Sequence, residues 1–188
     1  MNALAIKVFT SDLKTTETWK ECSIMEIERI SAFSEGDQGG NPAGVLISDQ
    51  HPSPDDMQSI AADVGYSETA FAMPEENGAW RVRYFSPQSE VPFCGHATIA
   101  LGSALARKYG NGLFQLVLNE AEITVEGETN GGLVQAALQS PPTNSKVASE
   151  SLTAEVLDLF GYTTDQIDER LPPAVIHGGA DHFALTLT

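Results

Sequence analysis

The residues from Cys94 to Ala97 open a predicted helix and carry the clearest chemical signal in the sequence. A helix that starts here leaves roughly four backbone N–H groups without helical acceptors. Gly95 lets a ligand approach the main chain closely, and the positive end of the helix dipole favours an anion. The sequence therefore predicts a pocket for a small carboxylate or phosphate at this helix start.

Glu68 is a second residue that could do chemistry. It stands at the mouth of a strand predicted within residues 66–73. Taken alone, an acid in such a place is most simply a solvated surface group. Its role depends on what the fold brings opposite to it.

The helix that follows Cys94 is predicted to be buried. From His96 to Tyr109 the sequence has no proline, and apolar residues lie on every side of a 3.6-residue helical projection. Arg107 and Lys108 suit the negative end of the helix dipole, and Gly110 can end the helix. We therefore expect this helix inside the fold.

Strands precede and follow this helix. Residues 80–85 alternate in polarity, which predicts a half-buried strand with Arg81 and Arg83 on a solvated face. Pro87 and Pro92 disfavour helix, so the segment between them is predicted to be extended. Further strands are predicted at residues 24–33, 45–48, 113–118, 123–126 and 133–138, with two more within 174–188.

Two shorter helices and a loop complete the pattern. Ser53 can cap a helix that Pro54 begins and Gly65 ends, and residues 152–160 form a second short helix. Residues 34–44 are a loop by composition. This loop lacks the spacing of a phosphate loop or a dinucleotide fingerprint, which argues against nucleotide binding.

Composition narrows the class of protein. The chain of 188 residues carries a formal net charge of −16, which argues against nucleic acid and anionic membrane surfaces as partners. No apolar run is long enough to span a bilayer, and charged residues interrupt any signal-like pattern at the N-terminus. With only two cysteines there is no disulfide framework, so we expect a cytoplasmic protein.

Three segments together resemble one known family. They are the run from Phe33 through Gly40-Asn41-Pro42-Ala43-Gly44-Val45, the run Gly65–Phe71, and the run from Phe85 to Cys94-Gly95-His96-Ala97-Thr98. Their residues, order and spacing resemble the PhzF-like isomerases of phenazine biosynthesis. The resemblance implies an α+β, diaminopimelate-epimerase-like fold of two similar halves, each a β-barrel-like sheet around a central helix, with the active site in the cleft between them.

The resemblance also implies roles for particular residues. Glu68 corresponds to the acid/base that moves a proton between two carbons of a small carboxylic acid without a cofactor, and His96 is its catalytic partner. Substrate contacts are implied at Asn41, Ser67, Gly95 and Ala97. Two alternatives stay open: that Asn41 only holds its turn, and that His96 only caps the helix. The expected partners are a small anionic metabolite and a second copy of the chain in a homodimer.

The sequence suggests an incomplete second half. We expect a poorly ordered leader at residues 1–22, an N-terminal barrel and helix domain at 23–139, and a partial C-terminal domain at 140–188 whose first residues, 140–145, resemble a linker. Nothing after Thr143 resembles the turn that opens the family's second central helix. We therefore expect a C-terminally truncated chain, and the alternative function is an inactive binding or assembly module.

Cys94 and a histidine cluster have competing interpretations. Cys94 occupies the position of a catalytic thiol in related two-thiol racemases, but no cysteine follows it, which favours a small buried residue. His177, Asp181 and His182 could suggest a metal site, but they lack the context of a known one. We therefore expect no metal and no cofactor.

Overall fold

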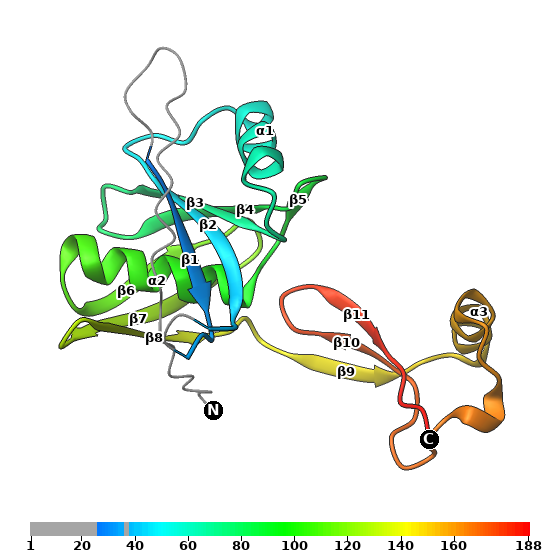
Figure 1. The fold of residues 1–188 in the computed structure, drawn as a ribbon. Coiled ribbons are helices and arrows are strands. Elements are labelled where there is room, and N and C mark those ends of the chain that lie inside the picture. Colours follow the sequence, from blue (N-terminus) through cyan, green and yellow to red (C-terminus); the bar gives the residue numbers. More distant parts are fainter. Residues whose placement is uncertain (1–25, 36–37) are drawn as a thin grey trace. The chain divides into compact units, whose positions relative to one another are not determined.

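The computed structural model of the chain describes residues 26–35 and 38–188, and its contacts divide the chain between Ser140 and Pro141 into two units (Figure 1). The expected leader at residues 1–22 lies outside the described residues. In the part of the chain that is described, no helix is both long and apolar enough to cross a membrane.

The first unit is built on one sheet of eight strands that curls around helix α2 (Figure 1). Neighbouring strands pair in the order β1-β2-β3-β4-β6-β7-β8, and β5 pairs with β4. The pairs β2–β3 and β4–β6 are parallel and the others are antiparallel. The strands are β1 (Ile27–Ala32), β2 (Asn41–Ile47), β3 (Thr69–Pro74), β4 (Trp80–Phe85), β5 (Glu90–Val91), β6 (Gly112–Val117), β7 (Glu122–Asn130) and β8 (Leu133–Gln139).

Helix α2 (Gly95–Tyr109) forms the centre of this unit, as its apolar surface on all sides predicts. Every residue from Ala97 to Ala106 is buried. The helix packs very closely on β7: a Cβ atom built on Gly127 would lie 2.4 Å from the carbonyl oxygen of Gly102. The absence of a side chain at Gly127 is therefore a condition for this packing distance.

Helix α1 (Pro54–Val64) contributes to a second, smaller core that contains Phe71 and Phe85. Its N-cap is Ser53, whose hydroxyl accepts from the backbone N–H of Asp56, and its C-cap is Gly65 in the left-handed conformation. Both ends confirm the predicted helix. Phe85 lies in phase with Arg81 and Arg83, yet it is only 3% exposed, because this second core packs around it.

One loop prediction in the first unit is corrected by the structure. Residues 41–44 are not loop but the start of β2, where Asn41 pairs with Ala32 and Gly44 pairs with Arg29. The predicted loop of residues 34–44 therefore ends before Asn41. The strand in fact begins at Asn41, so this motif is part of the sheet.

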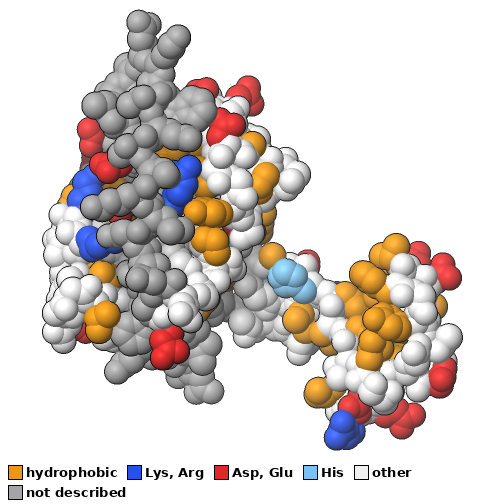
Figure 2. All heavy atoms as spheres, viewed as in Figure 1, with side chains coloured by type: hydrophobic (Ala, Val, Ile, Leu, Met, Phe, Trp, Pro, Cys, Tyr) orange, Lys and Arg blue, Asp and Glu red, His pale blue; other side chains and the backbone are white. Residues whose placement is uncertain are grey.

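The second unit pairs three short strands in the order β11-β10-β9, all antiparallel. Its elements are β9 (Asn144–Val147), α3 (Glu150–Phe160), the 3-10 helix η1 (Thr164–Gln166), β10 (Ala174–His177) and β11 (Asp181–Ala184). Strand β9 occupies part of the segment predicted as linker. Exposed apolar side chains are prominent on this unit (Figure 2), among them Leu159, Phe160 and Leu171.

Candidate functional site

Glu68 directly precedes β3, and the sheet fixes its main chain. The backbone N–H of Gly44 in β2 donates to the carbonyl of Glu68 across 3.2 Å. In the parallel register Gly44 lies opposite Thr69, and a Cβ atom on Gly44 would come within 2.7 Å of the Thr69 hydroxyl oxygen. Gly44 therefore allows β2 and β3 to approach at the point where the chain presents Glu68.

The start of α2 supplies the other side of the site. Cys94 is the N-cap in extended conformation, and the helical ladder begins with the N–H of Thr98 donating to the Cys94 carbonyl at 3.0 Å. The N–H groups of Gly95, His96 and Ala97 precede this first ladder bond. They are the donors that a helix N-terminus offers to an anion.

The structure brings four side chains from these two segments together. Oε2 of Glu68 lies 3.5 Å from Nε2 of His96 and 3.5 Å from Sγ of Cys94. Sγ of Cys94 lies 3.2 Å from Nδ1 of His96, and Oγ of Ser67 lies 3.4 Å from Nε2 of His96. The side chains of His96 and Glu68 are 10% and 22% exposed. The site is thus enclosed but still open to solvent at the carboxylate.

The surroundings of His96 favour its neutral form. Burial lowers the pKa of its imidazole, and this effect outweighs the Glu68 carboxylate and a hydrogen bond with the Pro42 backbone, both of which raise the pKa. A neutral imidazole carries one N–H and one lone pair. His96 can therefore donate a hydrogen bond to a ligand without bringing a full positive charge.

Cys94 is kept in its thiol form. Burial raises its pKa to about 12, and the adjacent Glu68 carboxylate adds to the increase. The nearby N–H groups of Ala97 and His96 oppose the shift in part, although the Cys94 side chain makes no capping hydrogen bond of normal geometry. At neutral pH the thiol is therefore a hydrogen-bond donor to Glu68, not a nucleophile.

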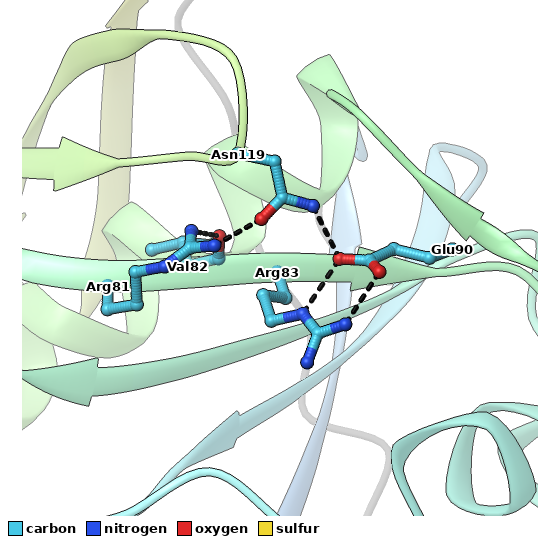
Figure 3. A network of polar contacts seen from close by, with 5 residues as sticks. All are labelled: Arg81, Val82, Arg83, Glu90 and Asn119. Atoms are coloured by element: carbon cyan, nitrogen blue, oxygen red, sulfur yellow. Dashed lines mark hydrogen bonds and ion pairs between the residues drawn. The ribbon is translucent and has the colours of Figure 1, made fainter. Parts of the chain in front are cut away.

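A polar network supports the segment that leads into the helix start (Figure 3). Arg83 in β4 makes two hydrogen bonds with Glu90 in β5, at 2.7 and 2.6 Å. Asn119 donates to Glu90 at 2.7 Å and accepts from Arg81. These contacts hold β5 onto β4 four residues before Cys94. Glu90 and Asn119 lie outside β4 in the sequence. The alternation of polar and apolar residues within β4 therefore does not predict this network.

The prediction of a solvated face for Arg81 and Arg83 is therefore wrong. Both side chains are half-buried and bonded, and the Arg83 guanidinium also lies 5.1 Å from the centre of the Phe85 ring. The signal that could have found the ion pair is the acid Glu90 placed between the two prolines of the extended segment.

The remaining predicted site residues have clear positions. Gly95 and Ala97 are the first and third residues of α2, beside His96. Asn41 is exposed at the start of β2, next to Pro42, whose backbone bonds to the His96 ring. In the second unit, Nδ1 of His177 lies 2.8 Å from Oδ1 of Asp181, and His182 joins no group of potential metal ligands among the residues described.

Comparisons with known proteins agree with this arrangement. The sequence profile of the family described as "Phenazine biosynthesis-like protein" matches residues 30–188. An uncharacterized isomerase of Pseudomonas aeruginosa is 42% identical over 166 residues, which are 87% of this chain and 57% of that protein. The trans-2,3-dihydro-3-hydroxyanthranilate isomerase of Pseudomonas fluorescens is 30% identical over 161 residues, which are 84% of this chain and 55% of that protein.

Solved structures show the same fold. A predicted epimerase from Pseudomonas aeruginosa superposes with a TM-score of 0.77 at 19% identity, over 87% of this chain and 60% of that one. The α+β, diaminopimelate-epimerase-like fold is thereby confirmed. The chain spans little more than half the length of the relatives that it matches. From the profile match and these similarities, the chain belongs to the phenazine biosynthesis-like protein family.

Proposed function

We propose that the protein is an isomerase or epimerase that moves a proton between carbons of a small carboxylic acid, and that this chain carries the acid/base group. The observation that carries the proposal is the meeting of the Glu68 carboxylate with His96 at the N-terminus of a buried helix. The relatives named as isomerases support the reaction class. A purely binding role is less favoured, because it gives no reason for an acid in this position.

Glu68 is the proposed acid/base. Its carboxylate removes a proton from a substrate carbon, and the resulting carboxylic acid, which can exchange its proton with water, delivers a proton to another carbon. One group can perform both steps, so the proposed reaction requires no cofactor. The backbone hydrogen bond from Gly44 keeps the residue in register with β2, which supports a fixed position for the reacting oxygen.

The helix start is the proposed anion site. Removal of a proton from carbon leaves negative charge on the substrate, and fixed donors are needed where that charge develops. The N–H groups of Gly95, His96 and Ala97 suit a substrate carboxylate, and the neutral imidazole of His96 suits the developing charge. Ser67, whose hydroxyl is 3.4 Å from the imidazole, is proposed to orient it.

Proton exchange at substrate carbon tests this proposal. The purified protein is incubated in deuterated water with trans-2,3-dihydro-3-hydroxyanthranilic acid, the compound in the name of the Pseudomonas fluorescens relative. We expect deuterium to enter at carbon. Glu68→Gln should abolish incorporation while the compound still binds, because the amide keeps the shape but cannot take the proton.

A matched control uses another acid near the opposite end of the same strand. Glu76 is exposed beyond the C-terminal end of β3, so Glu76→Gln should leave exchange unchanged. Full exchange in the Glu68→Gln protein would remove Glu68 from the mechanism. No exchange in the unmodified protein would remove this compound as a substrate.

A further inference from the structure

Glu68, Cys94 and His96 each present one atom that can bind a metal ion, and these atoms all lie within 4.8 Å of one another. Within residues 26–35 and 38–188 this is the one group of three or more such residues. It combines three donor types, a carboxylate oxygen, a thiol sulfur and an imidazole nitrogen. All three side chains are at least half-buried, so their positions are set by packing.

The separations suit a tetrahedral ion. Zinc bonds of about 2.3 Å to sulfur and about 2.0–2.2 Å to nitrogen and oxygen place tetrahedral donors about 3.4–3.6 Å apart. Sγ of Cys94 lies 3.5 Å from Oε2 of Glu68 and 3.2 Å from Nδ1 of His96. The third pair, Oε2 of Glu68 and the imidazole nitrogen, lies within 4.8 Å, so these two groups must move closer for all three donors to bind one ion. Three protein donors leave a fourth position for water.

The donor set selects among divalent cations. A thiolate and a carboxylate together balance the charge of a divalent ion, and the N–H groups of Ala97 and His96 offset part of the cost of forming the thiolate. Sulfur and imidazole donors suit zinc, whereas magnesium and calcium require oxygen ligands. This donor set therefore favours Zn²⁺ over Mg²⁺.

We propose that Glu68, Cys94 and His96 form a binding site for Zn²⁺, and that zinc bound there inhibits the isomerase. On binding, the ion accepts lone pairs from Oε2, Sγ and one ring nitrogen, and the thiol proton leaves to solvent. No electron is transferred. The bound carboxylate can no longer take a proton from carbon, so inhibition rests on the proposed function of Glu68, while the binding itself does not.

Metal binding is measured directly, without substrate. The full chain carries Cys22→Ser, so that Cys94 is its one thiol, and Zn²⁺ is titrated against a chromophoric chelator. We expect one ion per chain. Cys94→Ser and His96→Gln should each weaken binding by more than about tenfold, since even changes next to metal ligands reach that size. Co²⁺ should give a sulfur-to-metal charge-transfer band that Cys94→Ser removes.

Two controls separate this site from others. His177→Gln alters the His177–Asp181 pair of the second unit and should leave the affinity unchanged. Mg²⁺ should not compete. The proposal is overturned if no saturable one-to-one zinc binding occurs, or if Cys94→Ser and His96→Gln both bind zinc as tightly as the unmodified protein.

Inhibition is then measured in the deuterium exchange reaction. We expect Zn²⁺ to stop exchange and a chelator to restore it. If zinc binds as described but the protein exchanges no proton with this compound, the metal site stands and the proposed reaction with this compound fails. If exchange proceeds unchanged at saturating zinc, the isomerase stands and the inhibitory role is overturned.

Discussion

The hydroxyl of Tyr84 in β4 lies 2.7 Å from the hydroxyl of Thr98 in α2, and both are buried. Thr98 donates its own proton to the carbonyl of Cys94 at 2.7 Å. A hydroxyl has one proton to give, so Tyr84 must be the donor to Thr98. The bond therefore ties the first turn of α2, and the residues that it presents to the site, to the central strand of the sheet.

Tyr84→Phe should loosen this first turn. The change removes one buried hydrogen bond and should lower the free energy of unfolding by about 0.5–1.5 kcal/mol. Hydrogen exchange should also speed up at the Thr98 amide, whose bond to Cys94 starts the helix. Tyr109→Phe is the control, because Tyr109 is 53% exposed. Equal effects of the two changes on stability and exchange would contradict the role of Tyr84.

Cys94 should react slowly with alkylating reagents. With its pKa raised to about 12, the reactive thiolate is a far smaller fraction at neutral pH than in a free cysteine of pKa about 8.5. In a Cys22→Ser protein, iodoacetamide should modify Cys94 at a rate that still climbs about tenfold per pH unit above pH 9. Glu68→Gln should speed the reaction, because the carboxylate contributes to the raised pKa. A rate that levels off near pH 8 would contradict this.

The ion pair between Arg83 and Glu90 should stabilise the fold in a pH-dependent way. Hydrogen bonding to Arg83 lowers the pKa of Glu90, and the Asn119 bond adds to this. The unfolded chain therefore binds the proton more readily, so the contribution is present above the unfolded pKa of about 4.3 and is lost as pH falls through the lower folded value.

Glu90→Gln isolates that contribution. At neutral pH we expect a loss of about 0.5–1.5 kcal/mol in the free energy of unfolding, a modest figure because both side chains are partly exposed. Urea unfolding repeated at lower pH should show the difference from the unmodified protein shrinking. Glu122→Gln, at an exposed residue of β7, is the control. A difference that stays constant in acid would mean that the charge on Glu90 does not matter.

Much of the fold follows from local patterns in the sequence. Helix α2 is apolar on every side, and this predicts its place inside the sheet. The caps of α1 follow from Ser53 and Gly65, and the left-handed Gly161 ends α3. Each of these features depends on residues close together in the chain, so periodicity and capping chemistry were enough.

The contacts within the candidate site do not follow from local sequence patterns. An acid before a strand gives no sign of its partner, and only the family resemblance pointed from Glu68 to His96. Cys94 is the small buried residue that the sequence favours, and the contact of its thiol with Glu68 is the part that the sequence does not show. The bonds of Arg81 and Arg83 were missed because their partners belong to other strands and turns.

The close packing of α2 on β7 gives a last prediction. Gly127 is buried and pairs across the sheet with Gly112 of β6. A Cβ atom on Gly127 would meet the Gly102 carbonyl at 2.4 Å and Cβ of Ala106 at 2.8 Å, whereas one on Gly112 would meet nothing within 4 Å. Gly127→Ala must therefore push the helix from the strand, at a cost of about 1–3 kcal/mol in the free energy of unfolding.

Gly112→Ala is the matched control for this change. It adds the same methyl group to the neighbouring strand without a clash. It should leave the free energy of unfolding unchanged or raise it by about 0.4–1 kcal/mol, because alanine lowers the conformational entropy of the unfolded chain. Thermal and urea unfolding of the two variants provide the comparison. Because α2 also presents Cys94 and His96 to Glu68, Gly127→Ala should further weaken the zinc binding proposed above, and Gly112→Ala should not. Equal stability of the two variants would mean that helix and sheet are not held at the observed distance.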